Sequence, residues 1–208
     1  MIDLVNHIKA RIALPLPGVN AQIKMAPKGR SIQLSPPENA KESGVLILLF
    51  MEQNQWHTLL MRRTEDGSTH GGQISFPSGK REEADVDIIE TALRECEEEI
   101  GVEQTAVQLL GCLTPLYIPP SNFNVTPVLG VVAGDLNVTI SEREVQEIIK
   151  VPLSFLFDDA IKGMKSVSTS SGIQIETPVY SLDHAQLVWG ATAMMISELE
   201  YLVKEMVS

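Results

Sequence analysis

The chain has 208 residues, of which 44% are hydrophobic and 21% are charged, and its formal net charge at pH 7 is -11. These proportions are ordinary for a globular protein, and the length fits one domain with terminal additions. The negative charge argues against a non-specific binder of nucleic acid or of an anionic membrane, because such partners repel an acidic surface. The two cysteines, Cys96 and Cys112, form no CxxC pair, so neither a disulfide framework nor a zinc site is predicted.

The hydrophobic segments predict a cytoplasmic protein with no membrane partner. The longest unbroken apolar run, Val45 to Met51, is far shorter than the ~20 residues that span a bilayer. The first residues lack the basic start and the long apolar stretch of a signal peptide. A monomer and a homodimer are both compatible with the sequence.

The first part of the chain is predicted to hold one helix and then a pair of strands. Apolar residues at helical spacing indicate a short amphipathic helix: Ile2, Val5, Ile8 and Ile12. Residues 15–43 are rich in Pro, Gly, Lys and Ser, which is typical of an irregular connection. Strands are expected at 45–51, buried on both faces, and at 58–62, with a hairpin at Asn54 and Gln55.

The rest of the chain alternates strands with helices. A helix is expected to begin at Asp85 or Asp87 and to end at Gly101. Beyond it we predict strands at 107–113 and 125–132 around a loop at 117–122, a helix at 142–149, a hairpin of 173–175 with 179–182, and a helix at 187–207. This order predicts an α/β or α+β fold with a mixed sheet. It divides the chain into an N-terminal helix with an irregular extension, residues 1–43, and a single domain, residues 44–208.

Three glutamates are the chemically most informative feature of the predicted helix at 85–101. Glu95, Glu98 and Glu99 have the spacing i, i+3 and i+4 and gather on one side, opposite an apolar side formed by Ile89, Leu93, Cys96 and Ile100. Carboxylates this close repel one another unless a cation lies among them, and such oxygen ligands suit Mg²⁺ or Mn²⁺. Arg94 flanks the glutamates and could orient one of them. An acidic run of this kind is more often only a solvated helix face.

The segment from Gly79 to Val102 resembles the Nudix signature, Gly-x5-Glu-x7-Arg-Glu-U-x-Glu-Glu-x-Gly-U, in which U is a bulky apolar residue. The positions that match in identity and spacing are Arg94, Glu95, Glu98, Glu99, Gly101 and Val102, with Cys96 at the first U. Gly79 matches the opening glycine, but one extra residue separates it from Arg94. The first glutamate of the signature therefore falls at Asp85 or Val86, and Asp85 is the chemically plausible substitute.

The preceding segment resembles a motif of coenzyme A pyrophosphatases, Leu-Leu-Thr-x-Arg-(Ser or Ala)-x3-Arg-x3-Gly-x3-Phe-Pro-Gly-Gly. The residues that fit it are Leu59, Leu60, Arg63, Gly72, Phe76, Pro77 and Gly79. Four positions depart from it: Met61, Thr64, Ser68 and Ser78. The resemblance to these enzymes continues after the signature segment, in Pro119 to Phe123, Val151 to Leu153 and Trp189 to Ala193.

These resemblances imply a Nudix-type α/β/α sandwich around a mixed sheet, and they imply a site. The metal, Mg²⁺ or Mn²⁺, would be held by Glu95, Glu98 and Glu99 with the backbone carbonyl of Gly79. The catalytic group is expected to comprise Arg94 and a general base, for which Glu98, Glu144 and Glu147 stay open. The substrate would be contacted by Arg63, Gly72, Phe76 and Lys80. The four cations Arg62, Arg63, Lys80 and Arg81 could assist at an extra phosphate. His70 could touch the substrate, whereas Trp189 is interpreted as a packed core residue.

The partner implied by the resemblance is a small nucleoside diphosphate derivative, in the first place coenzyme A, which would yield 4′-phosphopantetheine and adenosine 3′,5′-bisphosphate. Three alternatives stay open at this point. The substrate could be ADP-ribose, a dinucleotide or a nucleoside triphosphate. The chain could be an isopentenyl diphosphate isomerase, although the intact glutamate run argues against that reading. It could also be a binding module that has kept the fold without the activity.

Overall fold

A central mixed sheet organises the chain in the computed structural model, which describes residues 2–28, 35–65, 67, 71–169, 172–183 and 185–204. Its strands follow the order β3 (Ile74–Ser75), β2 (Gln55–Arg63), β1 (Lys41–Glu52), β7 (Phe123–Val132) and β5 (Val107–Cys112). Three more strands pair with this set: β4 (Ser78–Lys80) with β1, β6 (Leu116–Ile118) with β7, and β8 (Val145–Pro152) with β2. β1 and β7 are parallel and the other pairs are antiparallel, so the sheet is mixed, as expected.

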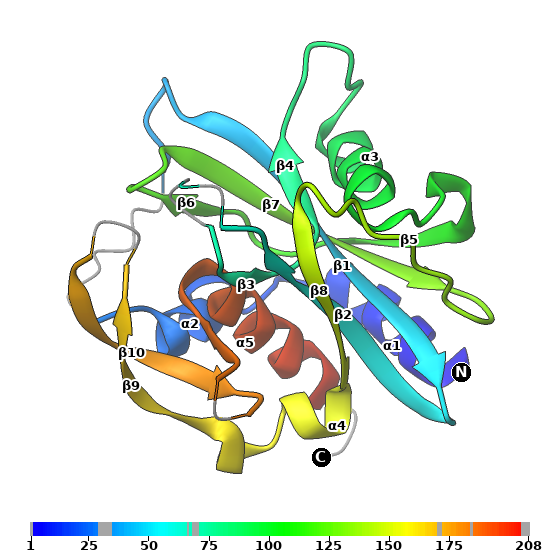
Figure 1. The fold of residues 1–208 in the computed structure, drawn as a ribbon. Coiled ribbons are helices and arrows are strands. Elements are labelled where there is room, and N and C mark those ends of the chain that lie inside the picture. The colour runs from blue at the N-terminus through cyan, green and yellow to red at the C-terminus, as the bar shows by residue number, and fades with distance from the viewer. Residues whose placement is uncertain are drawn as a thin grey trace.

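Helices cover both faces of this sheet (Figure 1). α3 (Ile88–Ile100) lies on one face, while α1 (Ile2–Ile12) and α5 (Gly190–Lys204) lie on the other. Successive side chains of β1 alternate between the two sides, because strand side chains point to opposite faces. Leu46, Leu48 and Phe50 pack with α3, and Val45, Ile47 and Leu49 pack with α5. The α/β/α layering and the mixed sheet implied by the sequence are therefore confirmed.

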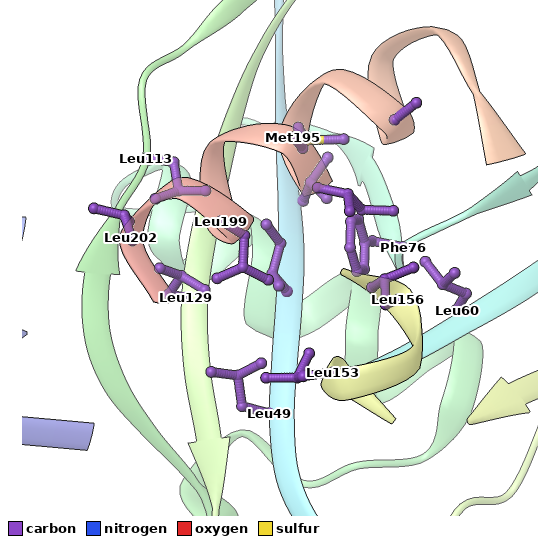
Figure 2. Packing of buried hydrophobic residues seen from close by; sticks show 14 of the residues in the cluster. Leu49, Leu60, Phe76, Leu113, Leu129, Leu153, Leu156, Met195, Leu199 and Leu202 are labelled. Atoms are coloured by element: carbon purple, nitrogen blue, oxygen red, sulfur yellow. The ribbon is translucent and has the colours of Figure 1, made fainter. Parts of the chain in front are cut away.

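The core beneath α5 is the larger of the two. Figure 2 shows Met195, Leu199 and Leu202 of this helix above the sheet residues Leu49 and Leu129. The short helices α2 (Val19–Gln22) and α4 (Leu153–Leu156) and the 3-10 turns at Ile23–Met25, Gln104–Ala106 and Asp159–Ile161 complete the described helices. None of the helices within the described ranges has the length and apolar composition needed to cross a lipid bilayer.

A second sheet lies outside the central one. It has three strands in the order β11 (Leu187–Trp189), β10 (Gln174–Ser181) and β9 (Lys162–Ser168), all antiparallel. Val188 and Tyr180 point into the core shared with α5. The second sheet thereby becomes part of the same folded body.

Several sequence expectations are confirmed. The amphipathic N-terminal helix forms as α1 and buries Leu4 and Ile8. The first hairpin forms, but its turn is Gln53 and Asn54, with φ values of 49° and 63°, one residue earlier than the expected Asn54 and Gln55, because Gln55 already pairs with Glu52. The helix of the glutamate run begins after Asp87, whose carboxylate accepts hydrogen bonds from the backbone of Ile89 and Glu90, and it ends at Gly101 with φ 72°.

Three expectations in the second half were wrong. Residues 142–149 are not a helix, because Val145–Pro152 forms β8 against β2. Residues 173–175 and 179–182 are not two arms of a hairpin, because Gln174–Ser181 is the single strand β10, whose partners are β9 and β11. Residues 187–189 are a strand, so the last helix begins only at Gly190; residues 205–207 lie outside the described part. The loop expected at 117–122 also contains the short strand β6.

The N-terminal segment is attached to the rest of the fold through a buried carboxylate. Glu198 on α5 has no exposed surface and accepts hydrogen bonds from Gly18 N (3.2 Å), Gln22 Nε2 (2.9 Å) and Thr114 Oγ1 (2.6 Å). Buried charges are retained where several donors satisfy them. The proposed division between residues 43 and 44 stays a prediction; β1 itself begins at Lys41.

Candidate active site

Two glycines set the position of α3 on the sheet. A side chain at Gly44 of β1 would place its Cβ 2.7 Å from Ala92 N and from Ile88 O, so only glycine lets the helix approach this closely. A Cβ at Gly79 of β4 would overlap the carboxylate of Glu95. The glutamate face of α3 is therefore held directly against the backbone of β1 and β4, which pair at these two glycines.

Glu99 is the buried member of the glutamate group, with 1% of its surface exposed. One oxygen accepts a hydrogen bond from Arg63 Nη1 at 3.0 Å and the other accepts one from the backbone N–H of Ser78 at 2.8 Å. The pKa of its carboxyl is raised to about 7, because burial and, to a smaller extent, the charge of Glu95 outweigh the lowering by Arg63 and by the N–H of Ser78. The expected placement of Glu99 on a face opposite the packed one is thus corrected, because the buried stripe of α3 includes Glu99 beside Ala92, Cys96 and Ile100.

Arg94 holds the neighbouring carboxylates in a fixed arrangement. Its Nε and Nη2 donate to the two oxygens of Asp85 at 2.9 and 3.0 Å, and its Nη1 donates to Glu95 at 2.9 Å and to Glu98 at 3.2 Å. Asp85, which occupies the place of the first signature glutamate, also accepts from Thr91 Oγ1, and the bond from Arg94 holds the pKa of this carboxyl well below its usual range. The contacts make Arg94 a positioning residue for Glu95 and Glu98.

The structure separates the two downstream candidates for the general base. Glu144 lies directly before β8. Burial is the main cause that raises the pKa of Glu95, and the charges of Glu98 and Glu144 add to it. Glu147 instead pairs with Arg62 Nε at 3.3 Å and accepts from Gln186 Nε2 at 3.0 Å. The charge of Glu144 thus acts on Glu95, whereas the oxygens of Glu147 are engaged by Arg62 and Gln186; Glu98, exposed over 56% of its side chain, borders the α3 glutamates.

The donor set fits a divalent cation. Within the described ranges no three Asp, Glu, His or Cys side chains converge into a ready-made metal cage. Mg²⁺, however, is usually held by one or two carboxylates together with water and substrate phosphates, so a full protein cage is not required. Burial raises the pKa of both Glu95 and Glu99; the charges of Glu98 and Glu144 add to the rise at Glu95, and the charge of Glu95 adds to the rise at Glu99. A cation between carboxylates relieves this kind of repulsion. Assignment of Glu95, Glu98, Glu99 and the Gly79 carbonyl as ligands remains a proposal.

The residues expected to contact substrate lie in different places. Arg63 is at the glutamates, through its bond to Glu99, and Lys80 is exposed at the end of β4. Gly72 lies on the other face of the sheet edge, where its carbonyl accepts from Arg62. Phe76 has no exposed surface and packs in the core beneath α5, as Figure 2 shows, so its expected role in binding substrate is corrected to packing.

Two of the four cations considered for an extra phosphate are engaged elsewhere. Arg62 pairs with Glu147, and Arg81 pairs with Glu42 at 2.7 Å. Lys80, by contrast, has no ion pair within the part of the chain that the structure describes. Ser68 and His70, which the sequence also singled out, lie outside the described residues.

Sequence reasoning missed the backbone of Ser78 as a partner of Glu99 and missed a cleft behind the sheet edge. The cleft has a volume of about 420 Å³ and lies between the β2–β3 edge and the second sheet. Trp189, expected to be a core residue, is half-buried and lines it. The motif that contains Arg63 pointed to this edge, but no local pattern indicates which strand of the second sheet faces it.

Comparison with known proteins agrees with this geometry. The family model described as NUDIX domain matches residues 40–167. A protein of Pectobacterium atrosepticum named "Uncharacterized Nudix hydrolase NudL" is 34% identical over 172 residues, which are 83% of this chain and 88% of that protein. A protein of the same name from Yersinia enterocolitica is 36% identical over 149 residues, covering 68% and 71% of the two chains.

The solved structure of a MutT/nudix family protein from Enterococcus faecalis has a similar fold, with a TM-score of 0.52 and 18% identity over 83% of this chain and 65% of that chain. The family model covers more than half of the chain, and it spans β1, the glutamate helix and β8. The chain therefore belongs to the Nudix family, as a Nudix hydrolase that acts on pyrophosphate bonds.

Proposed function

We propose that this protein hydrolyses the pyrophosphate bond of coenzyme A or an acyl derivative of it, with Mg²⁺ or Mn²⁺, to adenosine 3′,5′-bisphosphate and 4′-phosphopantetheine. The observation that carries the proposal is the 3.0 Å bond between Arg63 and Glu99. Arg63 belongs to the segment that resembles coenzyme A pyrophosphatases, and Glu99 belongs to the Nudix signature. The bond supports the view that the two motifs act as one site.

The chain's own residues would bind and orient the diphosphate. Glu95, Glu98 and Glu99, with the carbonyl of Gly79, would hold the cation, which neutralises phosphate charge and acidifies a bound water when it is present. Arg94 keeps Glu95 and Glu98 in place through hydrogen bonds of 2.9 and 3.2 Å. Lys80, exposed beside the glutamates, is suited to a phosphate oxygen. An acidic protein can thereby accept a polyanionic substrate.

The attacking water must lose a proton to a base within hydrogen-bond reach. Glu98 and Glu144 are the two candidates, since both act on Glu95 electrostatically. Glu147 is disfavoured, because its oxygens are engaged by Arg62 and Gln186. We place this reaction in the cytoplasm and leave the choice between monomer and homodimer to measurement.

The test is hydrolysis of coenzyme A with and without Mg²⁺ or Mn²⁺, resolved by chromatography beside ADP-ribose and NADH. We expect metal-dependent release of adenosine 3′,5′-bisphosphate that disappears in Glu99→Gln. Activity on ADP-ribose or NADH without cleavage of coenzyme A would replace the substrate and keep the family. The departures at Met61, Thr64, Ser68 and Ser78 would then be the first places to seek the reason.

A further inference from the structure

The cleft between the central sheet edge and the second sheet is separate from the glutamate group but joined to it by one strand. Side chains of β2 alternate between the two faces of the sheet: Leu59 and Met61 pack on the α3 side, and Leu60 packs on the α5 side. Arg63 continues the first set and reaches Glu99, whereas Arg62 lines the cleft. A ligand held at the glutamates therefore has to pass only the end of β2 to enter the cleft.

The rim between the two places is built by backbone contacts. Gly72 N donates to Thr64 O, Arg63 N donates to Gln73 O, and Thr64 N donates to Glu144 O. Gly72 has φ 72°, a conformation that favours glycine. The route from the glutamates to the cleft thus runs past Glu144 and Gly72, against which the side chain of Glu65 packs.

The lining of the cleft is uncharged overall and mixes apolar and hydroxyl groups. Trp189, Leu187, Ile74 and Val167 supply apolar surface, and Ser166 and Ser168 supply hydroxyls. The charged side chains in this lining are Arg62 and Glu65, whose formal charges cancel. Arg62 is further compensated by Glu147 at 3.3 Å and by the carbonyl of Gly72 at 3.5 Å.

This charge balance excludes a phosphate as the natural occupant. A phosphate group brings one to two negative charges, and it would meet Glu65 and Glu147 beside an arginine that is already paired. A neutral chain that carries amides, hydroxyls and methyl groups suits both kinds of lining. In coenzyme A the adenosine half carries the additional 3′-phosphate and the pantetheine half is uncharged beyond the pyrophosphate.

We propose that this cleft binds the pantetheine arm of the substrate, with the indole of Trp189 as its apolar wall, and that the adenosine half lies on the side of Lys80. The inference rests on the proposed function for the identity of the substrate. If the arm binds there, Trp189 and Leu187 determine which substrate is accepted, whereas the residues of the Nudix signature act on the pyrophosphate.

The experiment uses the two tryptophans of the chain, Trp56 in the first hairpin and Trp189 in the cleft. In Trp56→Phe the emission comes from Trp189 alone, and in Trp189→Phe it comes from Trp56. Each variant is titrated with 4′-phosphopantetheine and with adenosine 3′,5′-bisphosphate in the presence of Mg²⁺. We expect a saturable emission shift only for 4′-phosphopantetheine in Trp56→Phe. No shift there, or a shift with the adenosine half alone, would overturn the inference.

Kinetics supply the second measurement. Trp189→Ala should raise the KM for coenzyme A about tenfold, equivalent to ~1.4 kcal/mol, with kcat nearly unchanged and without effect on substrates that lack the arm. Trp56→Ala is the matched control, because it removes the same half-buried ring outside the cleft. Equal effects of the two variants would contradict the inference. A shift of the Trp189 emission without turnover of coenzyme A would contradict the proposed function and leave the inference about the cleft standing. Turnover of coenzyme A without any shift of the Trp189 emission would contradict the inference and leave the proposed function standing.

Discussion

At the scale of single residues, the site depends on carboxylates that the fold forces into dry surroundings. Glu99 is packed beneath Arg63 and Ser78, and Glu95 lies against Gly79. Burying either carboxylate as an anion costs free energy, and a nearby cation lowers that cost. The same burial that weakens their acidity therefore favours a bound metal.

Removal of the Glu99 charge should abolish the response to metal. For Glu99→Gln we expect turnover to fall by at least about 100-fold, since even indirect partners of a metal typically contribute 10–100-fold. Mg²⁺ should raise the melting temperature of the unmodified protein and leave that of Glu99→Gln unchanged, because a ligand stabilises only the state that binds it. Differential scanning fluorimetry with a Mg²⁺ titration measures this.

Glu97→Gln is the control, with the same substitution on the same helix at an exposed side chain that bonds Gln104. It should keep both turnover and the Mg²⁺ response. Retention of the metal response by Glu99→Gln would remove Glu99 from the ligand set.

Variants of Glu144, directly before β8, and of Glu147, within β8, should differ in their kinetic effects. Glu144→Gln is expected to lower kcat about 100-fold or more if it accepts the proton of the attacking water, the usual size of a general-base effect. Glu147→Gln loses its negative charge beside Arg62 and should change KM more than kcat. Steady-state rates on coenzyme A decide between them. A larger loss of kcat in Glu147→Gln than in Glu144→Gln would reverse the assignment.

The signature positions could be read from the sequence because their identities and spacing are local. The depth of Glu99 could not, because an ideal helical wheel centres the buried face on Ile89, Leu93, Cys96 and Ile100. In the structure Ile89 and Leu93 are only partly buried, and the helix is turned towards Glu99. That rotation depends on Gly44, Arg63 and Ser78, which are remote in sequence.

At the scale of elements, the ends of α3 are specified locally and should respond to local changes. Asp87→Ala removes the acceptor for Ile89 N and Glu90 N at the start of the helix. We expect the free energy of unfolding to fall by about 1 kcal/mol, which corresponds to a melting temperature lower by roughly 2–4 °C for a chain of this size. Thermal denaturation followed by circular dichroism provides the measurement. Asp87→Ser, which keeps an acceptor, should restore most of the loss, and an equal loss in both variants would contradict the capping role.

In the elements that were wrongly predicted, hydrogen bonding to a neighbouring strand overrides the local sequence pattern. Val145, Ile148 and Ile149 have the spacing of a helix face, but the free edge of β2 supplies backbone partners along its length, from His57 to Arg63. Val145 and Val151 are β-branched residues that fit a pleated surface. In β10, Thr177 and Pro178 interrupt the apolar pattern, yet the strand continues through them because β9 pairs across the interruption.

At the scale of the whole molecule, Glu198 joins segments that are distant in the chain. Glu198→Ala leaves the donors of Gly18, Gln22 and Thr114 without their acceptor in a buried place. We expect a loss of about 3 kcal/mol or more in the free energy of unfolding, since each buried donor left unsatisfied costs roughly 1–3 kcal/mol. Urea denaturation measures the loss, and hydrogen exchange should show faster exchange at the amides of Gly18 and Thr114.

Glu198→Gln distinguishes the contribution of the negative charge from that of the hydrogen-bond acceptor, because it removes the charge and keeps an accepting oxygen. It retains one carbonyl oxygen, so its loss should be smaller than that of the alanine variant. Unchanged exchange at Gly18 in Glu198→Ala would show that the N-terminal segment does not depend on this carboxylate. The α/β/α layering could be predicted from the order of elements, but this attachment could not, because no local pattern links residue 18 to residue 198.

The contact with the Glu198 carboxylate cannot form until almost the whole chain has been synthesised. Gln22 and Glu198 are 176 residues apart, which at typical rates of synthesis amounts to roughly ten to thirty seconds. During that interval Leu4, Ile8 and Met25 have been translated but the helix that covers them has not. The N-terminal segment is therefore expected to be the part of the nascent chain that most needs a chaperone, and to dock only after α5 has left the exit tunnel.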